Sequence, residues 1–201
     1  MKIIPSVMAK TQKEMNALFR KYTGVKELHL DIADGKFVSS KSLWFPFRLK
    51  SKFKYNAHLM VNDPLSWVKK NGKRVNLCIA SFESVDVEEY IAYCKANKMK
   101  VGFALKPETK VKSLVKWIKD IDAVLVLCVH PGFYGAKFLR GPLCKIKQIR
   151  DLNPRIKIYV DGGMKPSTVK YVKGADYAIS GSYLAKSDDF KKALKELKSA
   201  L

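Results

Sequence analysis

The chain has 201 residues, 47% of them hydrophobic and 11% aromatic, so it can bury one large core and is not an intrinsically disordered chain. Its formal net charge of +21 comes from 39 basic and 18 acidic residues, but 33 of the basic residues are Lys and 6 are Arg. Arg is the usual reader of bases, and the lysines are scattered without a block of five, so the composition argues against nucleic-acid binding as a main function. A positive field of this kind would instead attract small phosphorylated substrates.

Segments for export or membrane insertion are not expected in this chain. The longest apolar runs fall well short of the ~18 residues of a membrane span, and residues 1–10 lack the pattern of a signal peptide. Cys78, Cys94, Cys128 and Cys144 are widely spaced, and the chain has no Cys-x-x-Cys motif. We therefore predict reduced core cysteines in a cytoplasmic protein, with no membrane partner.

Short β-rich segments alternate with segments of helical periodicity along the chain. We predict strands at residues 2–7, 27–34, 55–61, 75–81, 100–105, 123–129, 157–162 and 177–182. We predict helices at residues 11–22, 64–71, 86–98, 110–121, 141–152, 166–174 and 187–201. The second helix position holds only residues 43–51, where we expect a short or irregular segment.

Eight strand–helix units of about 25 residues each predict a small (β/α)8 TIM barrel. An open, doubly wound sheet is the alternative, because the number of strands alone does not prove closure. We found no linker composition and no low-complexity segment. We therefore predict one barrel domain over residues 1–201.

Polar residues interrupt the apolar strands near their carboxyl ends, where the catalytic groups of such barrels lie. These residues are Ser6, His29, Asp31, Asp34, His58 and Asp161. A single polar residue in an apolar strand is more often a hydrogen-bonded core residue than a ligand. Two imidazoles and two carboxylates meeting at one barrel mouth, however, make a suitable ligand set for Zn, Fe(II), Mn or Co. The pattern therefore favours a site for one divalent metal ion.

Glycine-bearing segments follow the last three predicted strands, at residues 130–138, 161–164 and 180–186. Glycine lets backbone N–H groups approach an anion closely, and barrels often hold phosphate in the loops after strands seven and eight. Tight turns also need glycine, so each segment alone is weak evidence. Together they indicate a phosphate site.

Several motifs, taken in chain order, resemble those of the ribulose-phosphate 3-epimerase family. They are "KIIPS", "HLDIADGKFV", "AHLMVNDP", "VGFALKPET", "HPGFYGAKF", "VDGG" and "SGSYL". The resemblance extends from residue 2 to about residue 185, and it implies the ribulose-phosphate-binding type of (β/α)8 barrel.

The resemblance also implies roles for individual residues. Metal ligands would be His29, Asp31, His58 and Asp161, and the two aspartates would also be the catalytic acid and base. Substrate or phosphate contacts would come from Ser6, Met60, Gly132, Gly135, Gly162, Gly163, Gly181 and Ser182. The implied reaction, in the pentose phosphate pathway of carbohydrate metabolism, interconverts D-ribulose 5-phosphate and D-xylulose 5-phosphate. It would use two-base proton transfer through a metal-stabilised enediolate.

Some positions depart from the family pattern without removing an implied ligand. They are Ala33 for a methionine, Ser39 for a proline, Ser81 for a histidine, Leu127 for a methionine, and Tyr134 and Ala136 in the glycine loop. These changes leave open an epimerase of a related ketose phosphate, such as a six-carbon 2-ketose 6-phosphate, or an inactive phosphate-binding relative. A related aldolase or decarboxylase ranks lower, because the Asp34-Gly35-Lys36 segment lacks the second Asp of Asp-x-Lys-x-x-Asp. A homo-oligomer also stays open.

Overall fold

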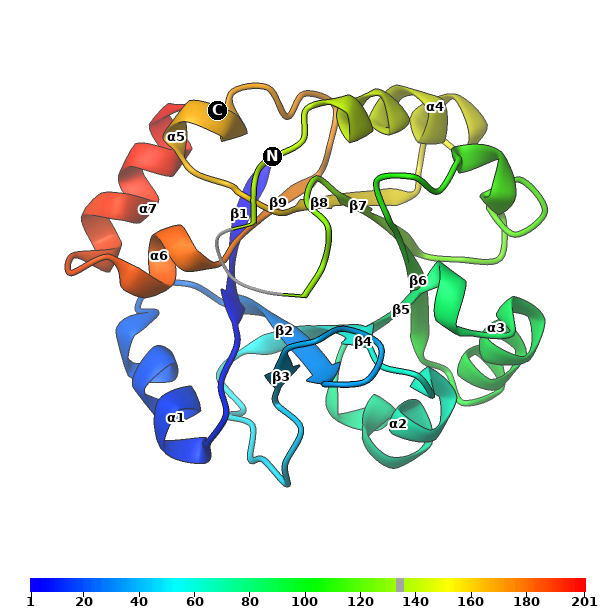
Figure 1. Cartoon of the computed structure of the whole chain (residues 1–201), viewed down its shortest axis with the longest axis horizontal. Helices are drawn as coiled ribbons and strands as arrows, with labels where there is room; N and C mark the ends of the chain where they lie inside the picture. The colour runs from blue at the N-terminus through cyan, green and yellow to red at the C-terminus, as the bar shows by residue number, and fades with distance from the viewer. Residues whose placement is uncertain (133–135) are drawn as a thin grey trace.

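Eight parallel strands close into a barrel in the computed structural model, which describes residues 1–132 and 136–201 (Figure 1). The strands are β1 (Lys2–Val7), β2 (Glu27–Asp34), β4 (Lys54–Met60), β5 (Leu77–Ser81), β6 (Lys100–Leu105), β7 (Ala123–Leu127), β8 (Lys157–Asp161) and β9 (Tyr177–Ser180). Because β1 pairs with both β9 and β2, the sheet has no open edge within this ring. The closure confirms the predicted TIM barrel and excludes the open sheet.

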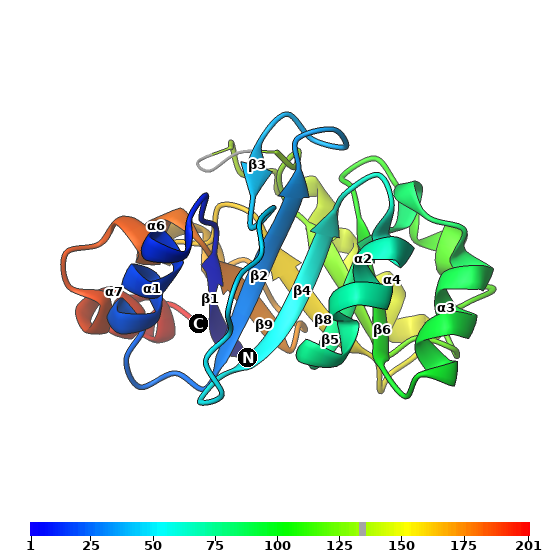
Figure 2. The same ribbon diagram turned by 90° about the horizontal axis from the view of Figure 1, so that it is seen from below.

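The predicted strands agree with the observed ones to within two residues at each end. A short strand that was not predicted, β3 (Lys41–Ser42), pairs antiparallel with the end of β2. In Figure 2 the barrel strands rise from the lower edge, and the segment that joins β2 to β3 lies above their upper, carboxyl ends. This hairpin therefore adds a wall to the carboxyl mouth of the barrel.

Helices surround the barrel (Figure 1). They are α1 (Gln12–Lys21), α2 (Pro64–Asn71), α3 (Val87–Ala96), α4 (Cys144–Leu152), α5 (Pro166–Val169), α6 (Ser182–Lys186) and α7 (Phe190–Ser199). Side chains of Thr11, Asp63, Asp86 and Asp189 accept backbone N–H groups in the first turns of α1, α2, α3 and α7. These caps fix where the four helices begin.

Two predicted helices are wrong in extent. Residues 110–121 form only a 3-10 turn, η3 (Val111–Leu114), followed by further turns with i to i−3 hydrogen bonds. The predicted helix at 166–174 ends as α5 at Val169 and continues in turns to Gly174, which has a φ of 84°. The other 3-10 turns are η1 (Gly72–Arg74), η2 (Phe82–Ser84) and η4 (Gly141–Leu143). Residues 43–51 contain no helix, as expected.

Two apolar cores follow from the alternation of side chains along each strand. On β2, Leu28, Leu30 and Ile32 pack outward against the helices, whereas the residues between them face the barrel interior. The interior is filled by Ile4, Leu77, Ile79, Ala104, Ala123, Leu125, Leu127, Tyr159 and Ile179. These apolar side chains fill the barrel interior next to the polar residues at the carboxyl ends of the strands.

The four cysteines are free thiols. Cys78, Cys94 and Cys128 are buried, and burial raises the pKa of each thiol, to about 12, 11 and 12, so they are inert core residues. The prediction was wrong for Cys144, which is exposed. In the described part of the chain, none of the helices has both the length and the apolar character needed to cross a membrane.

Candidate active site

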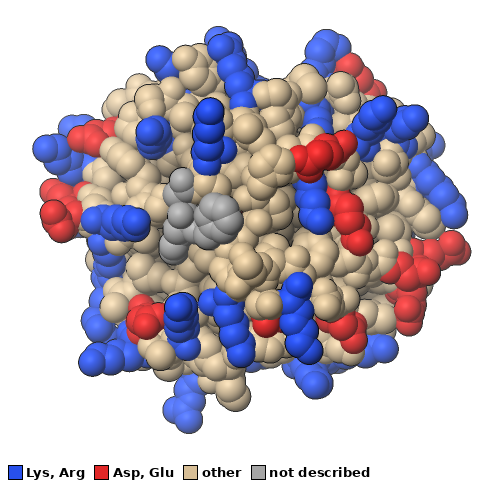
Figure 3. All heavy atoms as spheres, viewed as in Figure 1, with Lys and Arg blue, Asp and Glu red and all other residues tan. Residues whose placement is uncertain are grey.

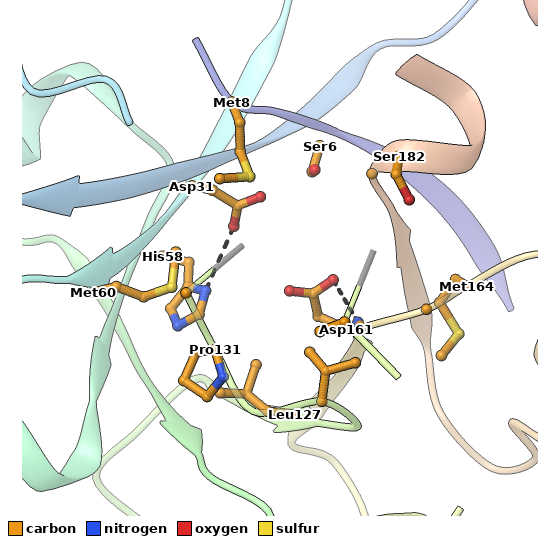
Figure 4. Close-up of a pocket in the computed structure, with 16 residues that line it drawn as sticks. Ser6, Met8, Asp31, His58, Met60, Leu127, Pro131, Asp161, Met164 and Ser182 are labelled. Atoms are coloured by element: carbon orange, nitrogen blue, oxygen red, sulfur yellow. Dashed lines mark hydrogen bonds and ion pairs between the residues drawn. The ribbon is translucent and has the colours of Figure 1, made fainter. Parts of the chain in front are cut away.

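A pocket opens at the carboxyl ends of the barrel strands, and most of the predicted site residues line it (Figure 4). These residues are Ser6, Asp31, His58, Met60, Gly132, Asp161, Gly162, Gly163, Gly181 and Ser182. His29 lies one inward position deeper on β2 than Asp31 and is fully buried. Gly135 and Tyr134 lie outside the described residues.

Asp31 forms the centre of a cluster of imidazoles and carboxylates. Its Oδ1 lies 3.5 Å from His29 Nε2 and 3.6 Å from His58 Nδ1. Asp161 approaches from β8, which is three strand positions from β2 around the ring. Figure 4 shows Asp31, His58 and Asp161 directed into a common space. One possible ligand atom from each of the four residues lies within 4.8 Å of the others.

The cluster has polar atoms that the protein itself does not pair. Both ring nitrogens of His29 and of His58, and Oδ1 of Asp31, are buried without a hydrogen-bond partner among the described residues. Buried polar atoms are normally paired, so this concentration of unpaired donors and acceptors is exceptional. A divalent transition metal takes imidazole nitrogens and carboxylate oxygens as ligands. The four residues therefore fit such an ion.

The two carboxylates have opposite pKa shifts. Burial acts to raise the pKa of Asp31, but the nearby imidazoles of His58 and His29 and the hydroxyl of Ser6 outweigh it and lower that pKa. Burial raises the pKa of Asp161 well above its ordinary value, and the neighbouring Asp31 charge raises it further. The Gly162 N–H donates to Asp161 Oδ1 at 2.7 Å and offsets this rise only in part. Asp31 is thus the more readily ionised of the two carboxylates and Asp161 the more readily protonated.

His29 is held as a neutral imidazole. Burial lowers its pKa from 6.5 to about 4, a shift that Asp31 opposes and His58 reinforces. A neutral ring is the form that offers a nitrogen lone pair to a metal. The deepest member of the cluster is therefore ready to act as a ligand at neutral pH.

The described glycines of the loops after the last three strands lie at the pocket. Gly132, Gly162, Gly163 and Gly181 line it together with Ser182, the first residue of α6. Gly162 has a φ of 105°, and a Cβ there would lie 2.7 Å from a methyl group of Val129. This position therefore needs glycine for both backbone conformation and space.

Asp34 ends β2 but does not join the metal-ligand cluster. Its Oδ1 accepts the backbone N–H groups of Lys36 and Phe37 at 2.7 and 2.9 Å, and its Oδ2 accepts that of Asn62 at 2.9 Å. Burial acts to raise the pKa of Asp34, but these bonds outweigh it and keep the carboxylate ionised. Asp34 therefore ties the hairpin after β2 to the loop after β4.

The tied hairpin carries a small apolar cluster to the mouth. Val38 packs there with Ala33 and Met60, and Phe37 lies against them. Met60 lines the pocket, and Ala33, its partner in the β2–β4 pairing, is fully buried beside it. The departure from the family pattern at Ala33 therefore lies beside a pocket residue.

The other departures from the family pattern lie at different depths. Leu127 and Ala136 line the pocket directly. Ser81 is buried, and its hydroxyl donates to the Leu59 carbonyl at 3.2 Å, so its polar group is satisfied by backbone. Ser39 lies on the hairpin, where its Oγ would be 3.8 Å from a Cβ on Gly132.

Several pocket residues were not predicted from the sequence. They are Met8, Val129, Pro131 and Met164. Each lies in the loop that follows a strand, and this position is the signal in the sequence that could have identified them as pocket residues. Most are apolar, however, and so do not stand out from core residues in the sequence.

Basic side chains surround the mouth, and acidic ones are interspersed among them (Figure 3). The pattern agrees with the scattering of lysines along the sequence. It gives the pocket a positive surrounding that attracts small anions.

Comparison of the sequence with known families and proteins gives a consistent result. The model described as the ribulose-phosphate 3 epimerase family matches residues 2–185. A ribulose-phosphate 3-epimerase from Encephalitozoon cuniculi is 33% identical, covering 92% of this chain and 86% of that protein. The protein of Oryza sativa named "Ribulose-phosphate 3-epimerase, cytoplasmic isoform" is 32% identical, covering 90% and 86%. The corresponding protein of Escherichia coli is 28% identical, covering 89% and 85%.

Solved structures of similar fold have low sequence identity to this chain. 3-Hexulose-6-phosphate synthase from Salmonella typhimurium has a TM-score of 0.69 at 14% identity, covering 100% of this chain and 98% of that one. 3-Keto-L-gulonate-6-phosphate decarboxylase from Vibrio cholerae has a TM-score of 0.69 at 10% identity, covering 99% and 96%. At these identities the likeness shows the barrel fold alone.

Proposed function

This chain belongs to the ribulose-phosphate 3-epimerase family, and we propose that it is a metal-dependent epimerase that interconverts D-ribulose 5-phosphate and D-xylulose 5-phosphate. Its family makes it an isomerase. The observation that carries the proposal is the pair Asp31 and Asp161, a buried and a half-buried carboxylate with opposite pKa shifts that face one pocket.

Epimerisation at carbon 3 requires a proton to leave one face of the sugar and another to arrive at the opposite face. A single base cannot reach both faces of a flat intermediate, so two acid–base groups are needed. Asp31 and Asp161 come from strands on different sides of the ring and would flank the reacting carbon. The ionised carboxylate accepts the first proton while the protonated one donates the second, and the roles exchange in the reverse direction.

The arrangement around each carboxylate sets where its proton is held. Because Asp161 Oδ1 accepts the Gly162 N–H, its Oδ2 is the oxygen left to carry a proton. Asp31 Oδ1 lies between the two imidazoles, and Ser6 lines the same pocket and contributes to the lowered pKa of Asp31. Ser6 is thus placed to orient this carboxylate and to contact the substrate.

His29, Asp31, His58 and Asp161 would hold the metal ion. When bound, a divalent ion acts as a Lewis acid that stabilises the negative charge developing on the substrate oxygens. Zn, Fe(II), Mn and Co all accept this ligand set.

The phosphate of the substrate would lie against the loops after β7, β8 and β9. Backbone N–H groups at Gly163 and Gly181 and the hydroxyl of Ser182 would donate to it, and Gly162, whose own N–H is bonded to Asp161, would let the backbone approach it closely. Anchoring one end of the sugar here, with Met60 packed on the other side, holds the reacting carbon at a fixed place between the carboxylates. We assign Gly132 to the same loop set.

The test is conversion of ribulose 5-phosphate by the purified chain, with and without added Zn, Mn, Fe(II) or Co. We expect xylulose 5-phosphate to form and the rate to depend on the metal. Conversion of a six-carbon 2-ketose 6-phosphate alone would support the same epimerase reaction on a different substrate. The departures at Ala33 and Leu127 would then be assigned to substrate choice. No conversion of any ketose phosphate by protein that contains its metal would overturn the proposal and leave a phosphate-binding relative.

We further propose a cytoplasmic location. The buried free thiols of Cys78, Cys94 and Cys128 support it, as does the name of the Oryza sativa relative. Fractionation of cells that express the chain would test it.

A further inference from the structure

The amino mouth of the barrel, opposite the catalytic pocket, is surrounded by four lysines that we call the lysine ring. They are Lys2, Lys54, Lys100 and Lys157, the first residues of β1, β4, β6 and β8. These are alternate strands of the barrel. In Figure 2 this mouth is at the lower edge, where the N-terminus lies.

All four lysines occupy inward-facing positions. Side chains two residues apart on a strand share a face, and Ile4 and Tyr159, two residues beyond the lysines of β1 and β8, belong to the barrel interior. On β6 the interior residue is Ala104, four residues beyond the lysine, and on β4 it is His58, again four residues beyond. The lysine ring is therefore directed toward the barrel axis.

The four positions also lie at one height along the axis. The row of paired residues that starts at Lys2 passes through Tyr159 on β8 and Ala104 on β6 and reaches Ser81 on β5. Continuing the β4–β5 register by one residue beyond the pair Leu59 and Ala80 brings the row to Met60 on β4. A barrel of this type shifts such a row by about eight residues per circuit, or about two for every second strand. On β8, β6 and β4 the lysines precede the residues of this row by about two, four and six positions, which is the expected shift. The other three lysines therefore lie at the same height along the axis as Lys2. The lysine ring is one of the four-residue layers that fill a TIM barrel, at its outermost level.

The lysine ring lines a single open cavity of about 550 Å³, together with Arg155. The cavity has two acidic residues against these five basic ones, and both acids already have partners. Glu27 Oε1 accepts the side-chain amide of Asn56 at 2.8 Å, and Asp122 Oδ2 accepts the Val101 N–H at 2.9 Å. These neutral partners leave both carboxylates charged, and the five basic residues against two acidic ones give the cavity an excess of positive charge.

The ring is poorly neutralised by neighbouring residues. Lys157 Nζ lies 3.9 Å from Asp176 Oδ1, at the limit of an ion pair. For the other three lysines, the described residues offer no carboxylate within 4.0 Å. Ends of surrounding helices at this face favour nearby cations, but four ammonium groups directed at one axis also repel one another. A bound anion would relieve that repulsion.

We propose that the lysine ring binds a compact, multivalent phosphate anion, such as pyrophosphate or triphosphate, free or as the phosphate chain of a nucleotide. Lysine supplies point charges with three rotatable donors each, which suits an anion with oxygens on all sides. Several lysines around one axis match an ion of several charges better than a single phosphate. The stacked pair Tyr159 and Tyr177, with ring centroids 4.4 Å apart, also lines the cavity. The site is independent of the proposed epimerase reaction.

The test is isothermal titration calorimetry with inorganic tripolyphosphate at 0.15 M salt. The ring variant is the double substitution Lys54→Gln and Lys100→Gln, and the matched control is Lys191→Gln and Lys195→Gln, two exposed lysines of α7. Both variants lose the same charge. We expect the control to bind as the unmodified protein does, and the ring variant to bind at least tenfold more weakly, at about fivefold for each lysine removed.

Three further readings complete the test. Equal weakening in both variants would show that binding depends only on the net charge of the protein, and it would overturn the proposal. No binding at all would also overturn it. Competitive inhibition of ketose phosphate turnover by tripolyphosphate, with binding unchanged in the ring variant, would place the anion in the catalytic pocket and would also overturn it. With binding at the ring established, tighter binding of ATP than of tripolyphosphate would identify a nucleotide, and equal binding a free polyphosphate. The ring variant is expected to retain full turnover and a normal melting curve, which shows that it is folded.

Discussion

The inward-facing residues near the carboxyl mouth sort the eight barrel strands into four polar and four apolar ones, which we call the polar half and the apolar half, although β9 of the apolar half lies between β1 and β8. In the polar half, on β1, β2, β4 and β8, they are Ser6, His29, Asp31, His58 and Asp161. In the apolar half, on β5, β6, β7 and β9, they are chiefly Ile79, Ala104, Leu125, Leu127 and Ile179. Ser81 is the polar exception, and its hydroxyl is satisfied by backbone.

The difference shows how one barrel interior serves both stability and chemistry. The apolar half excludes water and lowers the local dielectric, so charges in the polar half interact strongly. That environment is why burial is the largest influence on the pKa of Asp161 and of His29. Each half can be altered separately. Changes in the polar half are expected to lower kcat, and changes in the apolar half are expected to lower the stability of the fold.

The largest effect is expected from removing a carboxylate of the polar half. Asp31→Asn and Asp161→Asn should each lower kcat by about 1,000-fold, because each removes one acid–base group. Asp151→Asn, at an exposed position of α4, is the matched control and should leave kcat unchanged. Steady-state assays of folded protein would check this, and more than a tenth of normal activity in either site variant would contradict it.

Metal removal should have the next largest effect. Dialysis against a chelator is expected to lower kcat by at least about 100-fold, which corresponds to several kcal/mol of lost charge stabilisation. Adding back Zn, Mn, Fe(II) or Co should restore activity. Elemental analysis would show whether the dialysed protein is free of metal. Undiminished turnover by metal-free protein would contradict metal dependence.

Breaking the apolar half should instead cost stability. Leu125→Ala opens a cavity in the fully buried interior and should lower the free energy of unfolding by about 3 kcal/mol. The folded fraction should keep kcat within about twofold, a small change on the scale of catalytic substitutions. Leu152→Ala, at a residue 39% exposed, is the control and should change stability far less. Urea titration measures both, and a loss of kcat as large as that of Asp31→Asn would show that the two halves are not separable.

The metal-free protein should lose stability as the pH falls from about 6.5 toward 4. The pKa of His29 is about 4 in the folded chain and 6.5 in the unfolded one, so protons bind preferentially to the unfolded state in this window. The loss amounts to about 3 kcal/mol over the whole window at 1.36 kcal/mol per pH unit. Urea titrations at pH 7 and pH 4.5 would show it, and His29→Gln should flatten the difference. An equal pH dependence in that variant would assign the effect to other groups.

The smallest effect has the opposite sign. Burial raises the pKa of Asp161, so its ionised form destabilises the metal-free fold, and this cost grows as the pH rises through that pKa. Asp161→Asn should therefore melt at a higher temperature than the unmodified protein at pH 7 without metal, although it is inactive. The same variant melting lower would mean that Asp161 contributes structurally in its ionised form.

The sequence predicted the polar half better than the elements that surround it. His29, Asp31, His58 and Asp161 stand out because each interrupts an apolar strand at its carboxyl end, and the barrel rule brings such ends together. The family resemblance added their roles. The pocket-lining Met8 and Pro131 carry no comparable chemical signal.

Helical spacing gave a wrong prediction at residues 110–121, because turns can bury the same apolar side chains as a helix. Val111, Leu114, Ile118 and Ile121 have helical spacing and are all buried, yet turns with i to i−3 hydrogen bonds place them as well as a helix would. The strand β3 escaped prediction because a two-residue strand has no periodicity, and it forms only through pairing with β2.

The most direct test of the central claim is solvent deuterium exchange into ribulose 5-phosphate, followed by NMR at carbon 3 with metal bound. The account predicts deuterium at carbon 3 in both epimers with the unmodified protein, and loss of the isomerised product in Asp31→Asn and in Asp161→Asn. Full epimerisation without incorporation of solvent deuterium, or with either aspartate replaced, would contradict a two-carboxylate mechanism.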